Sequence, residues 1–289
     1  MSALCYLNGA YLPLDQACVS VMDRGFLFGD GVYEVIPAYG RRLFRLAAHL
    51  ARLENSLHAI RIDPPVAYDE WRKILERLVD ENPGEDQSVY LQVTRGVFPK
   101  RDHAFAGQPA SPTVFAMSTP IPEPDPALAE QGIAAVTLDD IRWSYCHIKA
   151  VTLLPNALLR QEAVDAGAGE AILIRDGEAT EGAASNLFIV RSGRLITPPK
   201  SPRLLPGITR DLVLELARAH GIPSEEAAIP VEALREADEI WVTSSTREIV
   251  PVTRLDGEPV GDGRPGPLFA RMREIYREYK EAFRRGEVD

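Results

Sequence analysis

Apolar side chains recur with two different periods along the first part of the chain. Residues 46–60 carry a leucine or isoleucine at every third or fourth position, and residues 71–79 show a similar spacing. Both runs predict amphipathic helices. Residues 88–95 alternate apolar and polar side chains, which is typical of a strand with one buried face. Residues 4–14 contain Asn8-Gly9 between two apolar runs and predict a hairpin, because this dipeptide supplies the positive φ values of a tight turn.

The second half of the chain begins after a proline-rich segment and has a different pattern. Residues 120–126 contain four prolines and predict an extended connector. Residues 139–149 are apolar, β-branched or aromatic enough to predict a strand, and residues 153–166 predict a helix that ends at Gly167. Residues 171–197 then predict a series of short strands separated by turns.

These patterns predict an α/β (α+β) fold with two domains. We expect a smaller N-terminal α/β domain over residues 1–119, a proline-rich linker over 120–130 and a β-rich C-terminal domain over 131–289. A chain of 289 residues is long enough for two domains that each bury a core.

Composition and charge narrow the classes of partner. Hydrophobic residues make up 45% of the chain and charged residues 26%, and the formal net charge is −10, so we expect neither nucleic acid nor an anionic membrane as a partner. Three cysteines form no close-spaced metal pair, and we expect no metal site. The N-terminus predicts no signal peptide, and no apolar run reaches the roughly 20 residues of a membrane helix. We therefore expect a cytoplasmic protein.

Lys149 is the first candidate for chemistry, because it lies where the predicted strand 139–149 meets the predicted helix 153–166. A lysine beneath apolar residues is poorly solvated as a cation, and desolvation lowers its pKa toward the neutral amine that attacks carbonyl groups. The residue type and position thus suggest a Schiff-base lysine. A solvated loop lysine is the alternative.

Three further segments offer groups that bind a ring or a phosphate. Glu181 lies within a predicted β run and is bracketed by small residues that let a planar ring approach; the alternative is a solvent-facing acid. Residues 205–211 lead into a helix whose first N–H groups, together with the Thr209 hydroxyl, form a natural phosphate seat or simply a capped helix. Ser244 and Ser245 follow a predicted strand and could complete such a seat.

Basic side chains supply candidate carboxylate and phosphate ligands. Arg52 lies on a polar flank of the predicted helix 46–60, where it either reaches an anion from a rigid support or is a surface arginine. Arg101 and His103 lie in a loop over residues 96–105 that carries basic groups flanked by aromatic ones. This pair is either a carboxylate trap or part of a solvated loop.

Taken together, these parts resemble the pyridoxal phosphate site of the class IV (fold-type IV) aminotransferases, and within them D-amino acid aminotransferase most closely. The resemblance covers nearly the whole chain, and its strength lies in the joint order and spacing of several motifs. These motifs are Asp23-Arg24-Gly25, residues 28–34, residues 92–96, residues 140–143, Ile148-Lys149, Thr180-Glu181-Gly182, residues 207–211 and residues 242–244.

The resemblance implies a role for each candidate residue. Lys149 would bind pyridoxal 5′-phosphate covalently and shuttle the proton of the substrate's α-carbon, and Glu181 would face the pyridine nitrogen. The phosphate would be held by Arg52, Ile208, Thr209, Ser244 and Ser245. The substrate carboxylate would be bound by Tyr33, Arg101 and His103, of which the arginine and histidine reach over from a partner subunit. The fold implied is a small N-terminal α/β domain followed by a larger, β-barrel-like α/β domain.

The resemblance further implies an enzyme and its substrates. We expect a homodimer that transfers the amino group of a D-amino acid such as D-alanine to 2-oxoglutarate by a two-step ping-pong route, with small amino acids and 2-oxo acids as partners. The alternatives are a branched-chain L-amino acid aminotransferase, an aminodeoxychorismate lyase, an (R)-amine transaminase, and a protein that binds the cofactor or another anion without catalysis.

Overall fold

The chain forms two compact units in the computed structural model, which describes residues 3–104, 111–123 and 125–288. Unit 1 comprises Met1–Pro122, Ile148–Leu153 and Phe283–Asp289, and unit 2 comprises Glu123–His147 and Leu154–Ala282. Phe105, the last residue of the predicted basic and aromatic loop, lies outside the described residues.

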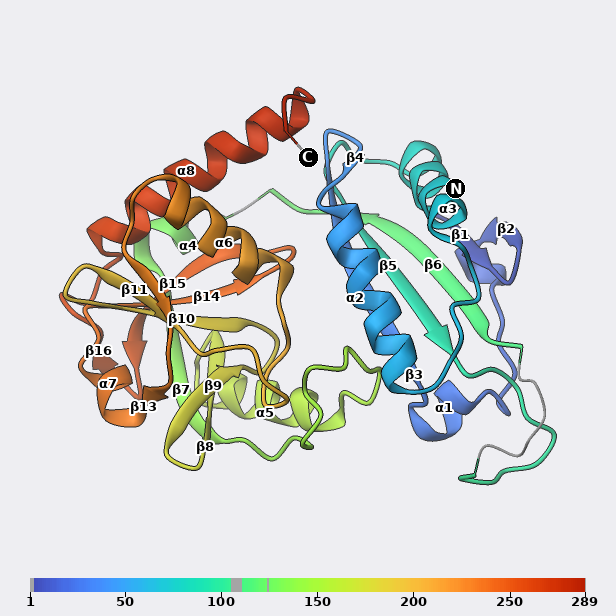
Figure 1. The fold of residues 1–289 in the computed structure, drawn as a ribbon, viewed down its shortest axis with the longest axis horizontal. Helices are drawn as coiled ribbons and strands as arrows, with labels where there is room; N and C mark the ends of the chain where they lie inside the picture. The colour runs from blue at the N-terminus through green and yellow to red at the C-terminus, as the bar shows by residue number, and fades with distance from the viewer. Residues whose placement is uncertain (1–2, 105–110, 124, 289) are drawn as a thin grey trace. The chain divides into compact units, whose positions relative to one another are not determined.

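Unit 1 contains a six-stranded antiparallel sheet in the order β2-β1-β6-β5-β3-β4 (Figure 1). Its strands are β1 (Leu4–Leu7), β2 (Ala10–Pro13), β3 (Gly31–Tyr39), β4 (Arg42–Leu43), β5 (Gln87–Thr94) and β6 (Thr113–Pro120). The predicted hairpin is confirmed, because Asn8 and Gly9 have φ values of 49° and 94° between β1 and β2.

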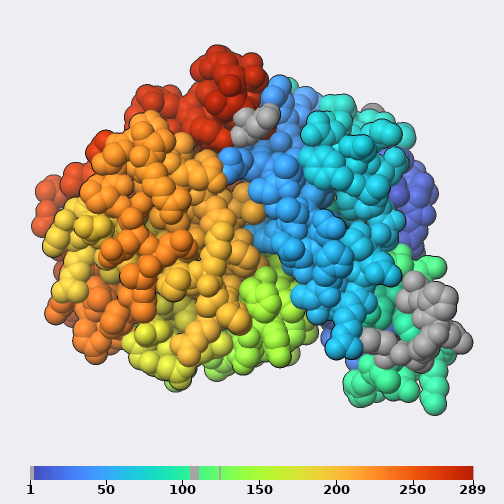
Figure 2. Space-filling model, viewed as in Figure 1, coloured from blue at the N-terminus to red at the C-terminus, as the bar shows by residue number. Residues whose placement is uncertain are grey.

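The helical segments of unit 1 are the 3₁₀ turn η1 (Leu14–Gln16), α1 (Arg24–Phe28), α2 (Leu46–Ala59) and α3 (Tyr68–Glu81). The two long helices cover one face of the sheet and lie beside each other on the surface shown in Figure 2. Leu50, Leu53 and Leu57 of α2 pack there against side chains of β3 and β5. The burial of each leucine stabilises the fold by about 2 kcal/mol, so the predicted apolar stripe of α2 is confirmed.

Unit 2 contains a ten-stranded mixed sheet in the order β12-β11-β10-β14-β15-β7-β8-β9-β13, with β16 beside β15 (Figure 1). Its strands are β7 (Ile133–Asp139), β8 (Glu170–Arg175), β9 (Glu178–Gly182), β10 (Asn186–Arg191), β11 (Arg194–Thr197), β12 (Ser224–Glu226), β13 (Ile229–Pro230), β14 (Glu239–Ser244), β15 (Glu248–Leu255) and β16 (Glu258–Pro259). Strand β7 runs parallel to both β8 and β15, and β11 runs parallel to β12.

The sheet of unit 2 curls around an apolar core. Ile172, Leu187, Ile240 and Val252 belong to this core, and Leu159 of α5 packs in a second cluster against β8. The helices are α4 (Pro126–Gln131), α5 (Leu154–Asp165), α6 (Ile208–Ala219), α7 (Val231–Arg235) and α8 (Pro267–Arg284), the last of which ends in unit 1.

The predicted strand over residues 139–149 is wrong for all but its first residue. Strand β7 ends at Asp139, and the chain then turns. Asp140 causes the turn, because its carboxylate accepts the backbone N–H of Arg142 at 3.1 Å. Lys149 therefore lies in a non-helical segment before α5 rather than at the end of a strand.

The described residues contain neither a membrane-spanning helix nor a cluster of metal ligands. No helix among residues 3–104, 111–123 and 125–288 is long and apolar enough to cross a membrane. No group of three or more histidine, cysteine, aspartate or glutamate side chains in those ranges could hold a metal ion.

Candidate active site

The backbone of Lys149 is fixed from two sides within unit 1. Its carbonyl oxygen accepts the N–H of Tyr33 at 2.9 Å, and the neighbouring Ala150 forms a bridge with Val32 at the start of β3. Its own N–H donates to the hydroxyl of Ser56 on α2 at 3.3 Å. A strand and a helix thus hold Lys149, and its side chain starts from a defined position.

The amine of Lys149 lies against the aromatic ring of Tyr33. Its Nζ is 4.2 Å from the ring centroid, a distance at which the face of the ring attracts a cation. Tyr33 in turn stacks on Tyr90, with ring centroids 5.7 Å apart. Of the residues predicted from the sequence, the structure therefore brings together the proposed nucleophile and one proposed substrate ligand.

A buried charge network lies on the same strand and helix. Glu34 is fully buried, and its carboxylate accepts hydrogen bonds from Nε and Nη2 of Arg52 at 2.7 and 2.8 Å. The His49 ring lies 2.8 Å from the same carboxylate. Arg52 is 7% exposed, so the surface alternative for this residue is wrong. The polar flank of α2 faces inward because Glu34 neutralises it.

The pKa values of Glu34 and His49 are both lowered, but for different reasons. Burial opposes ionisation of Glu34, but the Arg52 guanidinium and the His49 ring outweigh it and hold the pKa of Glu34 below its usual range. Burial lowers the pKa of His49 despite its contact with Glu34. His49 is thus neutral at pH 7, while Glu34 and Arg52 are charged. Glu34 and His49 were not predicted as partners of Arg52, although an acidic residue within an apolar strand indicates a buried charge that needs a partner.

Glu181 is buried within unit 2 and lies among three donors. Oε1 accepts a hydrogen bond from Nη1 of Arg142, and Oε2 accepts one from the Asn186 amide at 3.1 Å and one from the Leu205 N–H at 3.0 Å. Burial raises the pKa of Glu181 to about 7 even though Arg142 opposes that shift. The solvent-facing alternative for Glu181 is wrong, since the residue is 3% exposed.

Arg142 belongs to the site, although the sequence analysis included it only as part of the motif at residues 140–143. Its guanidinium binds both oxygens of Asp140, at 2.8 and 2.9 Å, in addition to Glu181. Asp140 also pairs with Arg175 at 3.0 Å. This network fixes Glu181 from one side and leaves its orientation little freedom.

Asn186 connects Glu181 to both predicted phosphate seats. Its amide donates to Glu181 and to the carbonyl of Leu205 at 2.8 Å, and it pairs across strands with Thr243. A Cβ on Gly207, the residue before α6, would lie 1.8 Å from Oδ1 of Asn186. The start of α6 and the end of β14 therefore both adjoin this asparagine.

The two predicted phosphate-binding segments, at the start of α6 and at the end of β14, carry groups that bind anions. The N-cap residue of α6 is Gly207, which has no side chain that could cap the first N–H groups of the helix, at Ile208 and Thr209. The hydroxyl of Thr243 is buried and has no hydrogen-bond partner among the described residues, and Ser244 and Ser245 follow directly. Backbone dipoles and hydroxyls of this kind bind phosphate oxygens.

The predicted carboxylate trap contacts α1 of unit 1. The guanidinium of Arg101 lies 4.9 Å from the centroid of the Phe28 ring, and the His103 ring lies 5.1 Å from it. Neither side chain forms a hydrogen bond or a ring contact with Lys149 or Tyr33 in the part of the chain that the structure describes. Arg101 and His103 therefore lie on the same ring, because both side chains contact Phe28.

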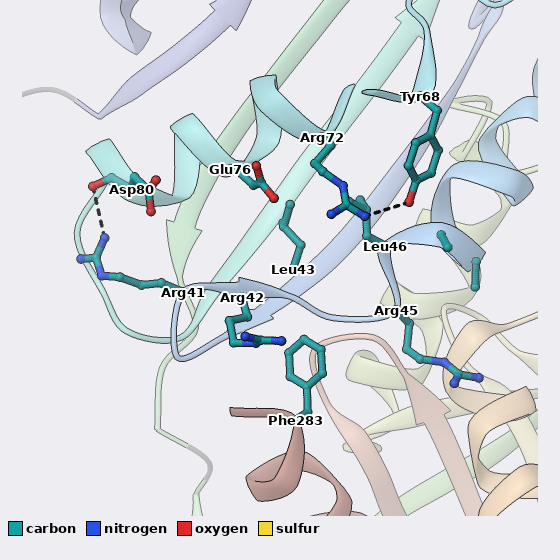
Figure 3. Close-up of a pocket in the computed structure, with 12 residues that line it drawn as sticks. Arg41, Arg42, Leu43, Arg45, Leu46, Tyr68, Arg72, Glu76, Asp80 and Phe283 are labelled. Atoms are coloured by element: carbon teal, nitrogen blue, oxygen red, sulfur yellow. Dashed lines mark hydrogen bonds between the residues drawn. The ribbon is translucent and has the colours of Figure 1, made fainter. Parts of the chain in front are cut away.

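A hollow of about 680 Å³ elsewhere in unit 1 contains none of the predicted site residues (Figure 3). Arg41, Arg42, Arg45 and Arg72 line it, together with Tyr68 and Phe283. Arg41 donates there to the carbonyls of Val79 and Asp80 at the end of α3, which stabilises that helix terminus. We therefore assign the chemistry to the groups around Lys149 and Glu181 and not to this hollow.

Comparison with known proteins gives matches along most of the chain. A model of the Amino-transferase class IV family matches residues 31–255. The D-alanine aminotransferase of Bacillus licheniformis is 43% identical over 261 residues, which cover 90% of this chain and 91% of that protein. The D-alanine aminotransferase of Staphylococcus haemolyticus is 38% identical over 277 residues, which cover 96% and 98%.

Solved structures match the fold closely. The branched-chain amino acid aminotransferase of Escherichia coli has a TM-score of 0.90 and 29% identity over 96% of this chain and 94% of that one. A further branched-chain amino acid aminotransferase, from T.th., was solved with pyridoxamine 5′-phosphate and has a TM-score of 0.89 and 30% identity over 97% and 94%. The predicted fold class is thereby confirmed.

Proposed function

The chain belongs to the class IV aminotransferase family, and from this premise we propose that it is a pyridoxal phosphate-dependent D-amino acid aminotransferase. It moves the amino group of a D-amino acid such as D-alanine to 2-oxoglutarate in two half-reactions. The observation that carries the proposal is the fixed position of Lys149 between β3 and α2, with its amine against Tyr33. The substrate class is supported by the D-alanine aminotransferases that the chain resembles.

The residues present fit the cofactor. Bound pyridoxal phosphate supplies an electron sink that makes the α-proton of an amino acid acidic. Lys149 would hold it covalently. Within unit 2, the start of α6, with Ile208 and Thr209, would bind its phosphate together with Ser244 and Ser245. Arg52 of unit 1 is proposed as a further phosphate ligand. The orphaned Thr243 hydroxyl beside these serines supports this assignment.

Each protein group then has a defined task. With the cofactor bound, the amine of Lys149 would take the proton from the α-carbon of the substrate and deliver it to the C4′ carbon of the cofactor on the same face. Glu181 would face the pyridine nitrogen and share a proton with it, a task for which a carboxyl group with a pKa of about 7 is well suited. Arg142 and Asn186 hold Glu181 in place while it does so.

Substrate recognition rests on Tyr33, Arg101 and His103. A guanidinium binds a carboxylate through two parallel hydrogen bonds, and the neighbouring histidine and tyrosine add donors. Fixing the α-carboxylate on one side decides which face of the α-carbon meets Lys149, and therefore which enantiomer reacts.

The test is a comparison of amino donors with one acceptor. Purified enzyme with D-alanine and 2-oxoglutarate is expected to release pyruvate, measured with a coupled dehydrogenase. Turnover of L-valine or L-leucine without turnover of D-alanine would overturn the substrate assignment. Release of pyruvate from aminodeoxychorismate without an amino acceptor would identify a lyase instead, and turnover of (R)-amines in preference to D-amino acids would identify an amine transaminase.

Branched-chain amino acid aminotransferase is the second candidate function, because the similar solved structures are enzymes of that name. A branched-chain enzyme would not need the Arg101 and His103 pair. The variant Arg101→Ala separates the two readings, because it should lower kcat/KM for D-alanine by 10-fold or more, about the loss of a charged hydrogen bond. Activity that is nearly intact in this variant would favour the branched-chain reading.

We further propose that the enzyme is a homodimer. Phe26 and Val19 are 70% and 54% exposed and line an apolar hollow of about 330 Å³ in unit 1. Val21, two positions after Val19 in the chain, and Val97, which forms a bridge with Asp23, are 66% and 50% exposed. A second copy of the chain is the occupant that fits this patch, because exposed apolar clusters mark association surfaces and Arg101 and His103 are expected to act across subunits. Light scattering should give twice the chain mass of 31.9 kDa, and Phe26→Asp should lower the measured mass.

The cytoplasmic location expected from the sequence remains a prediction.

A further inference from the structure

Helix α1 is short but held in place from both ends and from one side. The carboxylate of Asp23 accepts the N–H of Gly25 at 2.7 Å, and Gly29 ends the helix with φ 66°. A Cβ on Gly25 would lie 2.3 Å from a methyl carbon of Thr94, so only glycine lets the helix approach β5 this closely. The first and last residues of α1, Arg24 and Phe28, therefore start from fixed positions.

Arg24 connects α1 to the loop that follows β5. It is 3% exposed, and its Nε donates to Asp30 at 2.8 Å. Its Nη1 donates to the carbonyl of Asp102, and its Nη2 donates to the carbonyl of His103 at 3.1 Å. The buried Arg24 guanidinium thus binds the backbone carbonyls of two consecutive residues, Asp102 and His103.

Phe28 contacts the side chains of the same loop. The Arg101 guanidinium lies 4.9 Å and the His103 ring 5.1 Å from the centroid of its ring. The Arg24 guanidinium lies 4.8 Å from the same centroid and 5.2 Å from that of Phe98. One aromatic ring therefore contacts both proposed carboxylate ligands and the arginine that binds the carbonyls of Asp102 and His103.

We propose that Arg24 and Phe28 are positioning residues for substrate recognition: Arg24 fixes the backbone of residues 102–103, and Phe28 orients the side chains of Arg101 and His103 toward a carboxylate. This inference rests on the proposed function, in which that pair binds the α-carboxylate. Neither residue is expected to touch the substrate. A shift of about 1 Å in a binding group costs up to roughly 100-fold in rate, so a loosened loop should be visible in the kinetics.

The surrounding charges make this inference testable without unfolding the protein. Asp30 also receives two hydrogen bonds from Arg95, at 2.8 and 3.0 Å. Asp30 therefore keeps a charged partner when the Arg24 guanidinium is removed. Lysine at position 24 keeps the positive charge beside Asp30, but its ammonium group lacks the planar fork that reaches two carbonyls as well.

The experiment uses Arg24→Lys and Phe28→Leu in the full-length enzyme loaded with pyridoxal phosphate. Hydrogen exchange, measured by mass spectrometry, should speed up in peptides that cover residues 99–104. The KM for D-alanine and for 2-oxoglutarate should rise about 10-fold or more, with a smaller change in kcat and with the visible absorbance of the cofactor retained. The control is Arg77→Lys, which alters an exposed arginine whose guanidinium lies 3.8 Å from the centroid of the Tyr11 ring.

A double-mutant cycle separates positioning from a general structural role. The rate of the half-reaction with D-alanine should fall in Phe28→Leu, but Phe28→Leu should add little once Arg101 and His103 are both alanine. Equal losses in both backgrounds, or unchanged exchange and KM in both variants, would overturn the proposal. Wild-type enzyme that leaves D-alanine unconverted would overturn the proposed function instead, and the exchange data would still decide whether Arg24 and Phe28 hold the loop.

Discussion

Arg52 binds both carboxylate oxygens of Glu34 in the interior of unit 1, with N···O distances of 2.7 and 2.8 Å. The pair joins strand β3, which carries Tyr33, to helix α2, which carries Ser56, and Lys149 is hydrogen-bonded to both of these residues. The arginine proposed to bind phosphate and the lysine proposed to react are therefore anchored to the same two elements.

Replacing Glu34 with glutamine should destabilise the protein strongly. The substitution keeps the shape of the side chain but leaves the buried Arg52 guanidinium without its counter-charge, and breaking a buried ion pair in this way costs about 3 to 5 kcal/mol. Urea unfolding of the cofactor-free protein measures this cost. Arg77→Gln, which breaks the exposed pair with Glu81, is the control and should leave the unfolding midpoint unchanged.

Replacing Tyr33 with phenylalanine should impair recognition of the carboxylate while sparing Lys149. The ring that faces the amine remains, but the hydroxyl is lost, and a hydrogen bond to a charged group contributes about 1.5 to 3 kcal/mol. We expect kcat/KM for D-alanine to fall about 10-fold or more, and the absorbance of the cofactor-loaded enzyme to stay unchanged. Steady-state kinetics with a wild-type value of kcat/KM would remove Tyr33 from the substrate site.

Glu181 should make the cofactor-free protein less stable as the pH rises. Its pKa is 4.5 as a free group and about 7 when buried, so between these values the folded state binds more protons than the unfolded state. The stabilisation is fully present below pH 4.5 and is lost as the pH rises through 7, with a total change of at most about 3 kcal/mol.

The matched variant for this prediction is Glu181→Gln, which cannot ionise. Thermal melts of both proteins between pH 5 and pH 8 should show the wild type losing stability relative to the variant as the pH increases. A relative gain for the wild type would show instead that the contact with Arg142 outweighs burial and keeps Glu181 ionised.

Local sequence signals predicted the elements of the fold well. The apolar stripe of α2 and the Asn8-Gly9 turn each depend on residues close together in the chain, and both predictions are confirmed. The family and the aminotransferase class, predicted from ordered motifs, are confirmed by the match over residues 31–255 and by the relatives.

Contacts between distant residues were not predictable in the same way. Arg142 and Glu181 are 39 positions apart, and Arg52 and Glu34 are 18 apart, so no local pattern indicates that they pair. The turn after Asp139 was missed because side chains apolar enough for a strand outweighed the hydrogen bond that Asp140 makes to the backbone. A solvent-exposed position was only the alternative for Arg52 and Glu181, and the burial of both side chains excludes it.

The proposed reaction depends most on the amine of Lys149, and locating its bond to the cofactor tests the reaction most directly. The enzyme loaded with pyridoxal phosphate is reduced with borohydride, digested and mapped by mass spectrometry. The phosphopyridoxyl label is expected on Lys149, and Lys149→Ala is expected to abolish both the label and turnover. A label on another lysine, or no label on an active enzyme, would contradict the account.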